Sequence, residues 1–143
     1  MPKRVLRPPN LSFQPRPTYP YSPGTRGGEY VYTAGQVAWN HKGEIVGIGD
    51  VRAQTRQVLS NIESILREAG ASMSDVLKCN VYLADIRDFQ AMNEEFARAF
   101  PTDPPARTTV QAKRSLLSSP GKRDISPRSP AAARTPPASR KAK

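Results

Sequence analysis

The chain has 143 residues, of which 37% are hydrophobic and 15 are prolines, so it has room for one small domain. Its net charge of +10 is unevenly spread, because residues 113–143 hold nine Lys or Arg and a single acid, Asp124. Residues 1–112 hold 13 basic and 11 acidic side chains, which excludes a generally basic domain surface. With one cysteine, Cys79, and no long apolar run, we expect no internal disulfide, secretory signal or membrane span, and a cytoplasmic location.

The N-terminal region is rich in proline, with seven prolines between residues 1 and 23. Each proline removes a backbone donor, so we predict an extended arm over residues 1–18, followed by a domain over residues 19–112. Aromatic and β-branched residues predict the first strand over residues 29–36. A short returning strand is expected over residues 44–46.

A helix is predicted from Asp50 to about Ala69. Asp50 is a good N-cap, and Gly70 supplies the C-terminal stop. The apolar positions follow the helical period: Val51, Val58, Leu59, Ile62, Ile65, Leu66 and Ala69. The next strand is predicted over residues 76–83, with one apolar face formed by Leu77, Cys79, Val81 and Leu83.

A second helix is predicted after Asp85 or Asp88, either of which can cap it. Its apolar stripe is formed by Phe89, Met92, Phe96 and Phe100. We place Glu94 and Glu95 on its solvent-exposed side. A third strand is predicted over residues 107–112, after a proline-rich turn.

These elements predict an α+β fold in which two amphipathic helices pack on one face of a mixed sheet. The other face of the sheet has no helix to cover it, so we expect a homo-oligomer. After Ala112 the sequence shows neither the strand nor the helix period, and we predict a disordered tail over residues 113–143 that is basic and rich in Pro, Ser and Ala.

Several short motifs recur in a fixed order along the predicted domain. They are Pro20-Tyr21-Ser22-Pro23, Tyr32-Thr33-Ala34-Gly35-Gln36, Gln54-Thr55-Arg56-Gln57-Val58-Leu59-x-Asn61-Ile62, Glu68-Ala69-Gly70-Ala71-Ser72, Asp88-Phe89-x-x-Met92-Asn93 and Pro104-Pro105-Ala106-Arg107-Thr108-Thr109-Val110. In this order and spacing the chain resembles the RidA/YjgF family, also called the endoribonuclease L-PSP family. The motifs cover roughly two thirds of the chain.

The resemblance implies a chorismate-mutase-like fold and a homotrimer with ligand clefts at the subunit interfaces. It also implies hydrolysis of reactive enamines and imines, such as those from 2-aminoacrylate, to a 2-keto acid and ammonia. Neither a metal nor an organic cofactor is implied. The lone histidine, His41, lies in a predicted turn without a second ligand nearby in sequence, so we predict no metal site.

Five positions match the family's ligand site. Arg107 matches the arginine that binds the substrate carboxylate, a task that suits a planar guanidinium, although a lone arginine more often forms a surface salt bridge. Tyr21 matches the tyrosine that closes the cleft, or else it only pins the arm to the domain. Asn93 matches an asparagine of the second helix and otherwise is a polar residue beside the stripe. Ala34 and Gly35 match the pair that borders the ligand, where a glycine permits close approach.

The chain departs from the family after Ala112. The family continues through a Leu-Pro turn into a last strand, and a glutamate of that strand is taken to activate the attacking water. Residues 113–143 contain no glutamate, and we expect the last strand to be missing. Loss of such an acid–base group typically costs about 10²–10⁴-fold in rate. Runs of Arg, Pro, Ser and Ala suggest an out-of-frame reading, which the coding DNA tests.

Three functions therefore stay open from the sequence. The first is a RidA-like deaminase of 2-imino acids. The second is a non-catalytic member that binds a small carboxylate or acts as a chaperone, which would bind ligand without releasing ammonia. The third is nonspecific nucleic-acid binding through the basic tail, which would be lost with residues 113–143.

Overall fold

The computed structural model describes residues 2–11, 20–112 and 132–134. The N-terminal part of the described chain forms an antiparallel sheet of three strands, β1 (Arg4–Leu6), β2 (Gly24–Gly27) and β3 (Tyr30–Thr33). The first predicted strand is therefore present but shorter than residues 29–36. Neither β1, which lies within the predicted arm, nor β2 was predicted.

The first helix, α1, spans Val51–Glu68 and confirms the predicted cap and stop. The side chain of Asp50 accepts hydrogen bonds from the backbone N–H groups of Arg52 (3.0 Å) and Ala53 (3.1 Å). Gly70 has φ 76°, a left-handed conformation that glycine adopts without strain and that commonly ends a helix. The guanidinium of Arg26 in β2 donates to the carbonyl oxygen of Ala69 (2.8 Å), which ties the first sheet to this helix end.

The second sheet is built around β4 (Lys78–Leu83), which pairs in parallel with β5 (Ala106–Gln111). A single 3-10 turn, η1 (Met73–Asp75), precedes β4. Cys79, Val81 and Leu83 are buried as predicted, but Leu77 is 49% exposed. The prediction for Leu77 is wrong because the regular alternation of the strand begins only at Lys78.

The second helix, α2 (Phe89–Ala99), follows a 3-10 turn, η2 (Ile86–Asp88), that Asp85 caps through the backbone N–H of Arg87. Three members of the predicted apolar stripe are buried: Met92, Phe96 and Phe100. The fourth, Phe89, is 38% exposed at the first turn of the helix.

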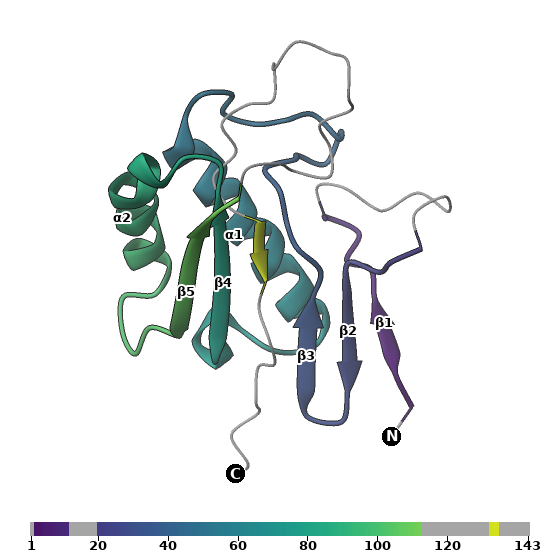
Figure 1. Cartoon of the computed structure of the whole chain (residues 1–143). Helices are drawn as coiled ribbons and strands as arrows, with labels where there is room; N and C mark the ends of the chain where they lie inside the picture. The colour runs from purple at the N-terminus through teal and green to yellow at the C-terminus, as the bar shows by residue number, and fades with distance from the viewer. Residues whose placement is uncertain (1, 12–19, 113–131, 135–143) are drawn as a thin grey trace.

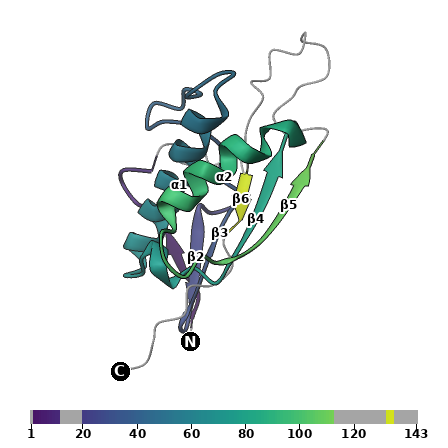
Figure 2. The same cartoon turned by 90° about the vertical axis from the view of Figure 1, so that its left-hand side faces the viewer.

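Both helices lie on the same side of the strands, which confirms the predicted α+β arrangement (Figure 2). In Figure 1 the strands run side by side in the order β5, β4, β6, β3, β2, β1. The core lies between the helices and the strands, and its most deeply buried side chains include Leu6, Ile62, Ile65, Leu66, Leu83 and Met92. On the opposite face Tyr30, Tyr32 and Val110 remain about half exposed, so this face of the sheet has no cover within the described chain.

A short strand follows Ala112, which corrects the expectation that no further strand is present. The backbone of β6 (Ala132–Arg134) pairs antiparallel with β4, with Val81 opposite Ala133. The physical reason is that β4 would otherwise expose a row of unpaired backbone groups on that edge. The predicted disorder of the rest of the tail lies outside the described residues.

Candidate functional site

The side chain of Arg107 lies between β5 and α2. Arg107 pairs in register with Cys79 of β4, whose side chain is buried on the helix side of the sheet. The guanidinium Nη2 donates to the side-chain oxygen Oδ1 of Asn93 at 2.6 Å. Its central carbon lies 4.6 Å from the ring centre of Phe96 and 5.5 Å from that of Phe89. The structure thus brings together two of the predicted site residues, Arg107 and Asn93.

Arg107 has no carboxylate partner among the described residues. Six other described arginines form ion pairs with acids: Arg4, Arg52, Arg56, Arg67, Arg87 and Arg98. Burial lowers the pKa of Arg107, although an arginine stays charged at neutral pH. A partly buried charge without a counter-ion is costly, and this one is held by an amide, two aromatic rings and a thioether sulfur, all of which are neutral. The arrangement therefore suits the binding of an external anion.

The hydroxyl of Thr109 lies on the same face of β5, two residues after Arg107. Its oxygen is buried and has no hydrogen-bond partner in the described part of the chain. Alternation along the strand places both side chains on the helix side, because Thr109 is opposite the buried Val81. The helix side of β5 therefore carries a second polar group, the buried Thr109 hydroxyl, in addition to the guanidinium.

Helix α2, which carries Asn93, is fastened to α1 by a buried acid. Glu95 is only 3% exposed, so the prediction that it lies on the solvent side is wrong. Its carboxylate accepts from Arg56 of α1 at 2.9 Å and from Arg98 of its own helix at 2.8 Å. The arginines supply the charge that allows an acid to be buried there.

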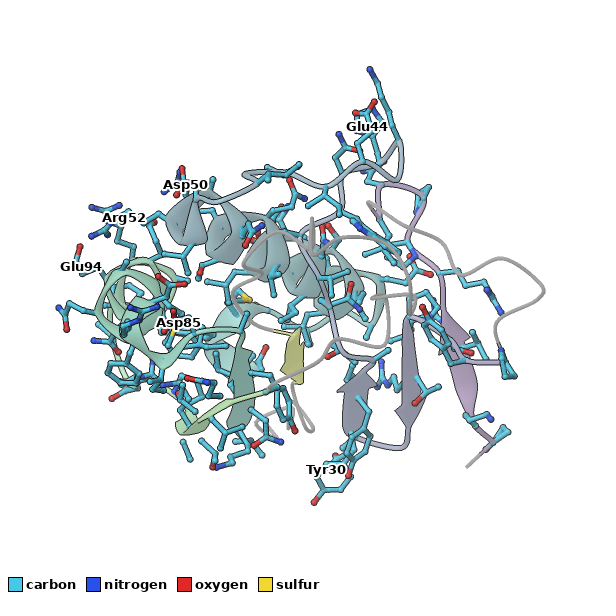
Figure 3. The ribbon with its side chains drawn as sticks, turned by 45° about the horizontal axis from the view of Figure 1, so that its top comes forward. Tyr30, Glu44, Asp50, Arg52, Asp85 and Glu94 are labelled. Carbon is cyan, nitrogen blue, oxygen red and sulfur yellow. The ribbon has the colours of Figure 1, made fainter. Side chains whose placement is uncertain are left out.

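The neighbouring acid, Glu94, forms the exposed part of the same contact. Figure 3 shows Arg52 and Glu94 close together, projecting from α1 and α2 respectively. The hydrogen bond from Arg52 lowers the pKa of Glu94. This second ion pair also joins α1 to α2. Two adjacent acids, Glu94 and Glu95, therefore hold α2 in place against α1.

The other three predicted site residues lie around the end of β3. The backbone N–H of Ala34 donates to the carbonyl of Pro23 at 2.8 Å, which places the segment of Tyr21 beside Ala34 and Gly35. The side chain of Tyr21 is 49% exposed, and Gly35 is exposed as well. This part of the molecule is open to a ligand or a partner.

Buried Asn61 of α1 holds the segment that follows Gly35. Its Nδ2 donates to the carbonyls of Val37 (3.2 Å) and Trp39 (3.3 Å), and its Oδ1 accepts from Gln57 (2.9 Å). The motif from Gln57 to Asn61 therefore fixes the backbone beside the predicted ligand position.

The two groups of residues are separated within one chain. Figure 1 shows β4 and β6 between β5, which carries Arg107, and β3, which leads to Ala34. One copy of the chain thus presents the arginine group and the tyrosine–glycine group on different parts of the sheet.

The sequence did not identify the apolar side chains around Arg107 as part of the site. Phe89, Met92 and Phe96 were assigned only to the apolar stripe, yet the sulfur of Met92 lies 4.0 Å from Nη1 of Arg107. The available signal was their spacing, since residues 89, 92, 93 and 96 share one face of a helix. An asparagine within an apolar stripe indicates that the stripe contacts a polar group.

The described residues contain no cluster of three or more His, Cys, Asp or Glu side chains placed to hold a metal ion. Within the same ranges no helix combines the length and the apolar character needed to cross a membrane.

Comparison with known proteins gives concordant matches. The sequence profile of the family described as Endoribonuclease L-PSP matches residues 12–118. A RutC family protein of Pyrococcus horikoshii is 48% identical over 101 residues, which are 70% of this chain and 79% of the relative. The crystal structure of Escherichia coli TdcF with bound serine is 27% identical, with a TM-score of 0.76 over 96% of this chain and 99% of that one. Yeast Mmf1, at 24% identity, shares the fold with a TM-score of 0.81 and covers 98% of this chain and all of its own.

Proposed function

Since the chain belongs to the endoribonuclease L-PSP family, which is the RidA/YjgF family, we propose that it is a deaminase of 2-imino acids. The observation that carries the proposal is Arg107, a partly buried guanidinium that has no carboxylate partner among the described residues. A small molecule with a carboxylate would supply the missing counter-ion through two parallel hydrogen bonds.

The proposed reaction begins with the enamine 2-aminoacrylate, which tautomerises to 2-iminopropanoate. Arg107 holds the carboxylate, so that the imine carbon is presented to water in a fixed orientation. Water adds to the C=N bond, and the C–N bond of the resulting carbinolamine then breaks to leave pyruvate and ammonia. Tyr21 would close the cleft, and Ala34 and Gly35 would border the ligand. The reaction needs no metal or organic cofactor.

The test is release of ammonia and pyruvate from freshly generated 2-aminoacrylate. We expect the protein to accelerate both above the spontaneous rate, in equal amounts. The rate is expected to be about 10²–10⁴-fold below that of a relative with a positioned glutamate, because residues 113–143 contain none. A folded protein that leaves the spontaneous rate unchanged would contradict the proposal.

The second candidate is a member that binds a small carboxylate without catalysis or acts as a chaperone. It is favoured by the absence of glutamate from residues 113–143, the part of the chain in which the family resemblance places the residue that activates water. Binding of serine or pyruvate without ammonia release would identify it. The third candidate, nonspecific nucleic-acid binding, would act through residues 113–143, because residues 20–112 hold nine basic and eleven acidic side chains and so carry no net positive charge.

We also propose a homotrimer whose clefts combine Arg107 of one subunit with Gly35 of the next. Two variants test this: Arg107→Ala, which removes the carboxylate contact, and Gly35→Val, which fills the ligand space from an exposed position. Each is expected to be inactive alone. When equal amounts of the two variants are mixed and their subunits associate at random, about a quarter of the sites should be intact. Each intact site takes Arg107 from a Gly35→Val subunit and Gly35 from an Arg107→Ala subunit.

The control for this experiment is a mixture of each variant with itself, taken through the same dissociation and reassembly. Activity in the mixed sample that stays at the level of these controls would show that both residues act within one chain.

In keeping with the family, we further propose that the protein acts in the cytoplasm.

A further inference from the structure

The contact between Asn93 and Arg107 has a fixed polarity. A guanidinium has donors and no acceptor, so the amide of Asn93 must turn its oxygen, and not its nitrogen, toward Arg107. The bond of 2.6 Å from Nη2 uses that oxygen. Asn93 therefore contacts the guanidinium with its acceptor group, which leaves its N–H₂ group and the second lone pair of the oxygen for other partners.

The other neighbours of the guanidinium are also neutral. The rings of Phe96 and Phe89 lie 4.6 and 5.5 Å from its central carbon, and the Met92 sulfur lies 4.0 Å from Nη1. These groups restrict the rotation of the side chain without cancelling its charge. The contrast with Glu95, two residues further along α2, is direct, because that acid is paired with Arg56 and Arg98.

From this geometry we infer that Asn93 is a positioning residue, which orients Arg107 while leaving its charge uncompensated. The anion affinity of the site then depends on residue 93 being neutral. The inference rests on the proposed function and changes the role first assigned to Asn93, which was direct contact with the substrate. An aspartate at this position would form an ion pair with Arg107 and compete with the carboxylate of the ligand.

The test compares Asn93→Asp with Asn93→Ala, and uses pyruvate as the probe, measured by calorimetry at pH 7. Asn93→Asp keeps the shape and the acceptor oxygen, and its affinity for pyruvate is expected to fall on the order of 10–100-fold. Asn93→Ala loses the contact but adds no charge, so its loss should be smaller. The two variants should rank in the opposite order in thermal stability, with Asn93→Asp at least as stable as the unchanged protein.

The pH dependence supplies a readout that a purely structural role would not change. Arg107 would hold the pKa of the new aspartate below its usual value of about 4. The affinity of Asn93→Asp for pyruvate should therefore recover only when the pH falls below this lowered pKa. Asn93→Ala should show no such recovery. Each variant is compared with the unchanged protein at the same pH.

Two outcomes would overturn the inference. One is an Asn93→Asp variant that binds pyruvate as tightly as the unchanged protein. The other is an Asn93→Ala variant that loses more affinity than Asn93→Asp, which is the order expected if Asn93 contacts the ligand directly. Failure of the proposed function is distinct from both, because the unchanged protein would then neither bind pyruvate nor release ammonia.

Discussion

Replacing Arg107 by alanine is expected to lower kcat/KM for the imine of 2-aminoacrylate by about 100-fold or more. The reason is that Arg107 combines a partly buried charge with guanidinium N–H groups that Asn93 leaves for a ligand. The described residues offer no second cation held in the same way. Replacing it by lysine should cost nearly as much, about 10–100-fold, because an ammonium cannot form the two parallel bonds or stack between Phe89 and Phe96. The measurement is initial ammonia release at several substrate concentrations.

The matched control is Arg67→Ala. Arg67 is exposed on α1, and its ion-pair partner among the described residues is Glu63, one helical turn away. Replacing Arg67 therefore removes a positive charge without touching the candidate site. Its kcat/KM should stay within about twofold of the unchanged protein, since an exposed ion pair contributes little. If Arg107→Lys retained full activity, the guanidinium geometry would not matter and the site would recognise charge alone.

The helices were predictable because their signals are local. Asp50 caps α1 through its own side chain and Gly70 ends it with a positive φ, and both properties can be recognised from residue type. The strands β1 and β2 were not predictable in the same way. The pairing partner of β1 is distant in sequence. Strand β2 pairs with the neighbouring β3, but Gly24 and Gly27 in β2 lack the β-branched or aromatic character that indicates a strand.

The candidate site could be predicted residue by residue but not as an assembly. The order of motifs identified Arg107 and Asn93, and the structure joins them across fourteen positions of sequence. The separation of this pair from Tyr21 and Gly35 depends on strand order, which a linear sequence does not reveal. The aromatic rings were assigned to the core because a phenylalanine in an apolar stripe usually has no other role.

Glu95 shows the same limit for charged residues. Its position beside Glu94 gave a pattern typical of an exposed helix face, and its burial results from Arg52, Arg56 and Arg98, two of which belong to the other helix. Arg98 is near Glu95 in sequence, but only the packing of α1 against α2 brings Arg52 and Arg56 to it. A buried acid of this kind is therefore found from the structure, although its energetic role follows from elementary electrostatics.

Replacing Glu95 by alanine is accordingly expected to lower the free energy of unfolding by about 2–3 kcal/mol. Removing the side chain leaves a gap between the helices and leaves three arginines without their shared acceptor. Those arginines are partly exposed and regain water, so the decrease in the free energy of unfolding stays below that for a fully buried pair. Glu95→Gln should cost less, because it fills the space and keeps one oxygen acceptor. Urea unfolding at a single protein concentration measures both, since association of subunits would shift the midpoint.

The comparison variant is Arg56→Ala, which removes one exposed partner and leaves Glu95 bonded to Arg98. It should lower the free energy of unfolding by less than about 1 kcal/mol. A similar loss for Arg56→Ala and Glu95→Ala would show that the contact acts as a single surface ion pair. If Glu95→Ala lowers the free energy of unfolding more than Arg56→Ala does, we also expect Glu95→Ala to bind pyruvate more weakly. The reason is that α2 carries both Asn93 and Phe96 to the guanidinium of Arg107.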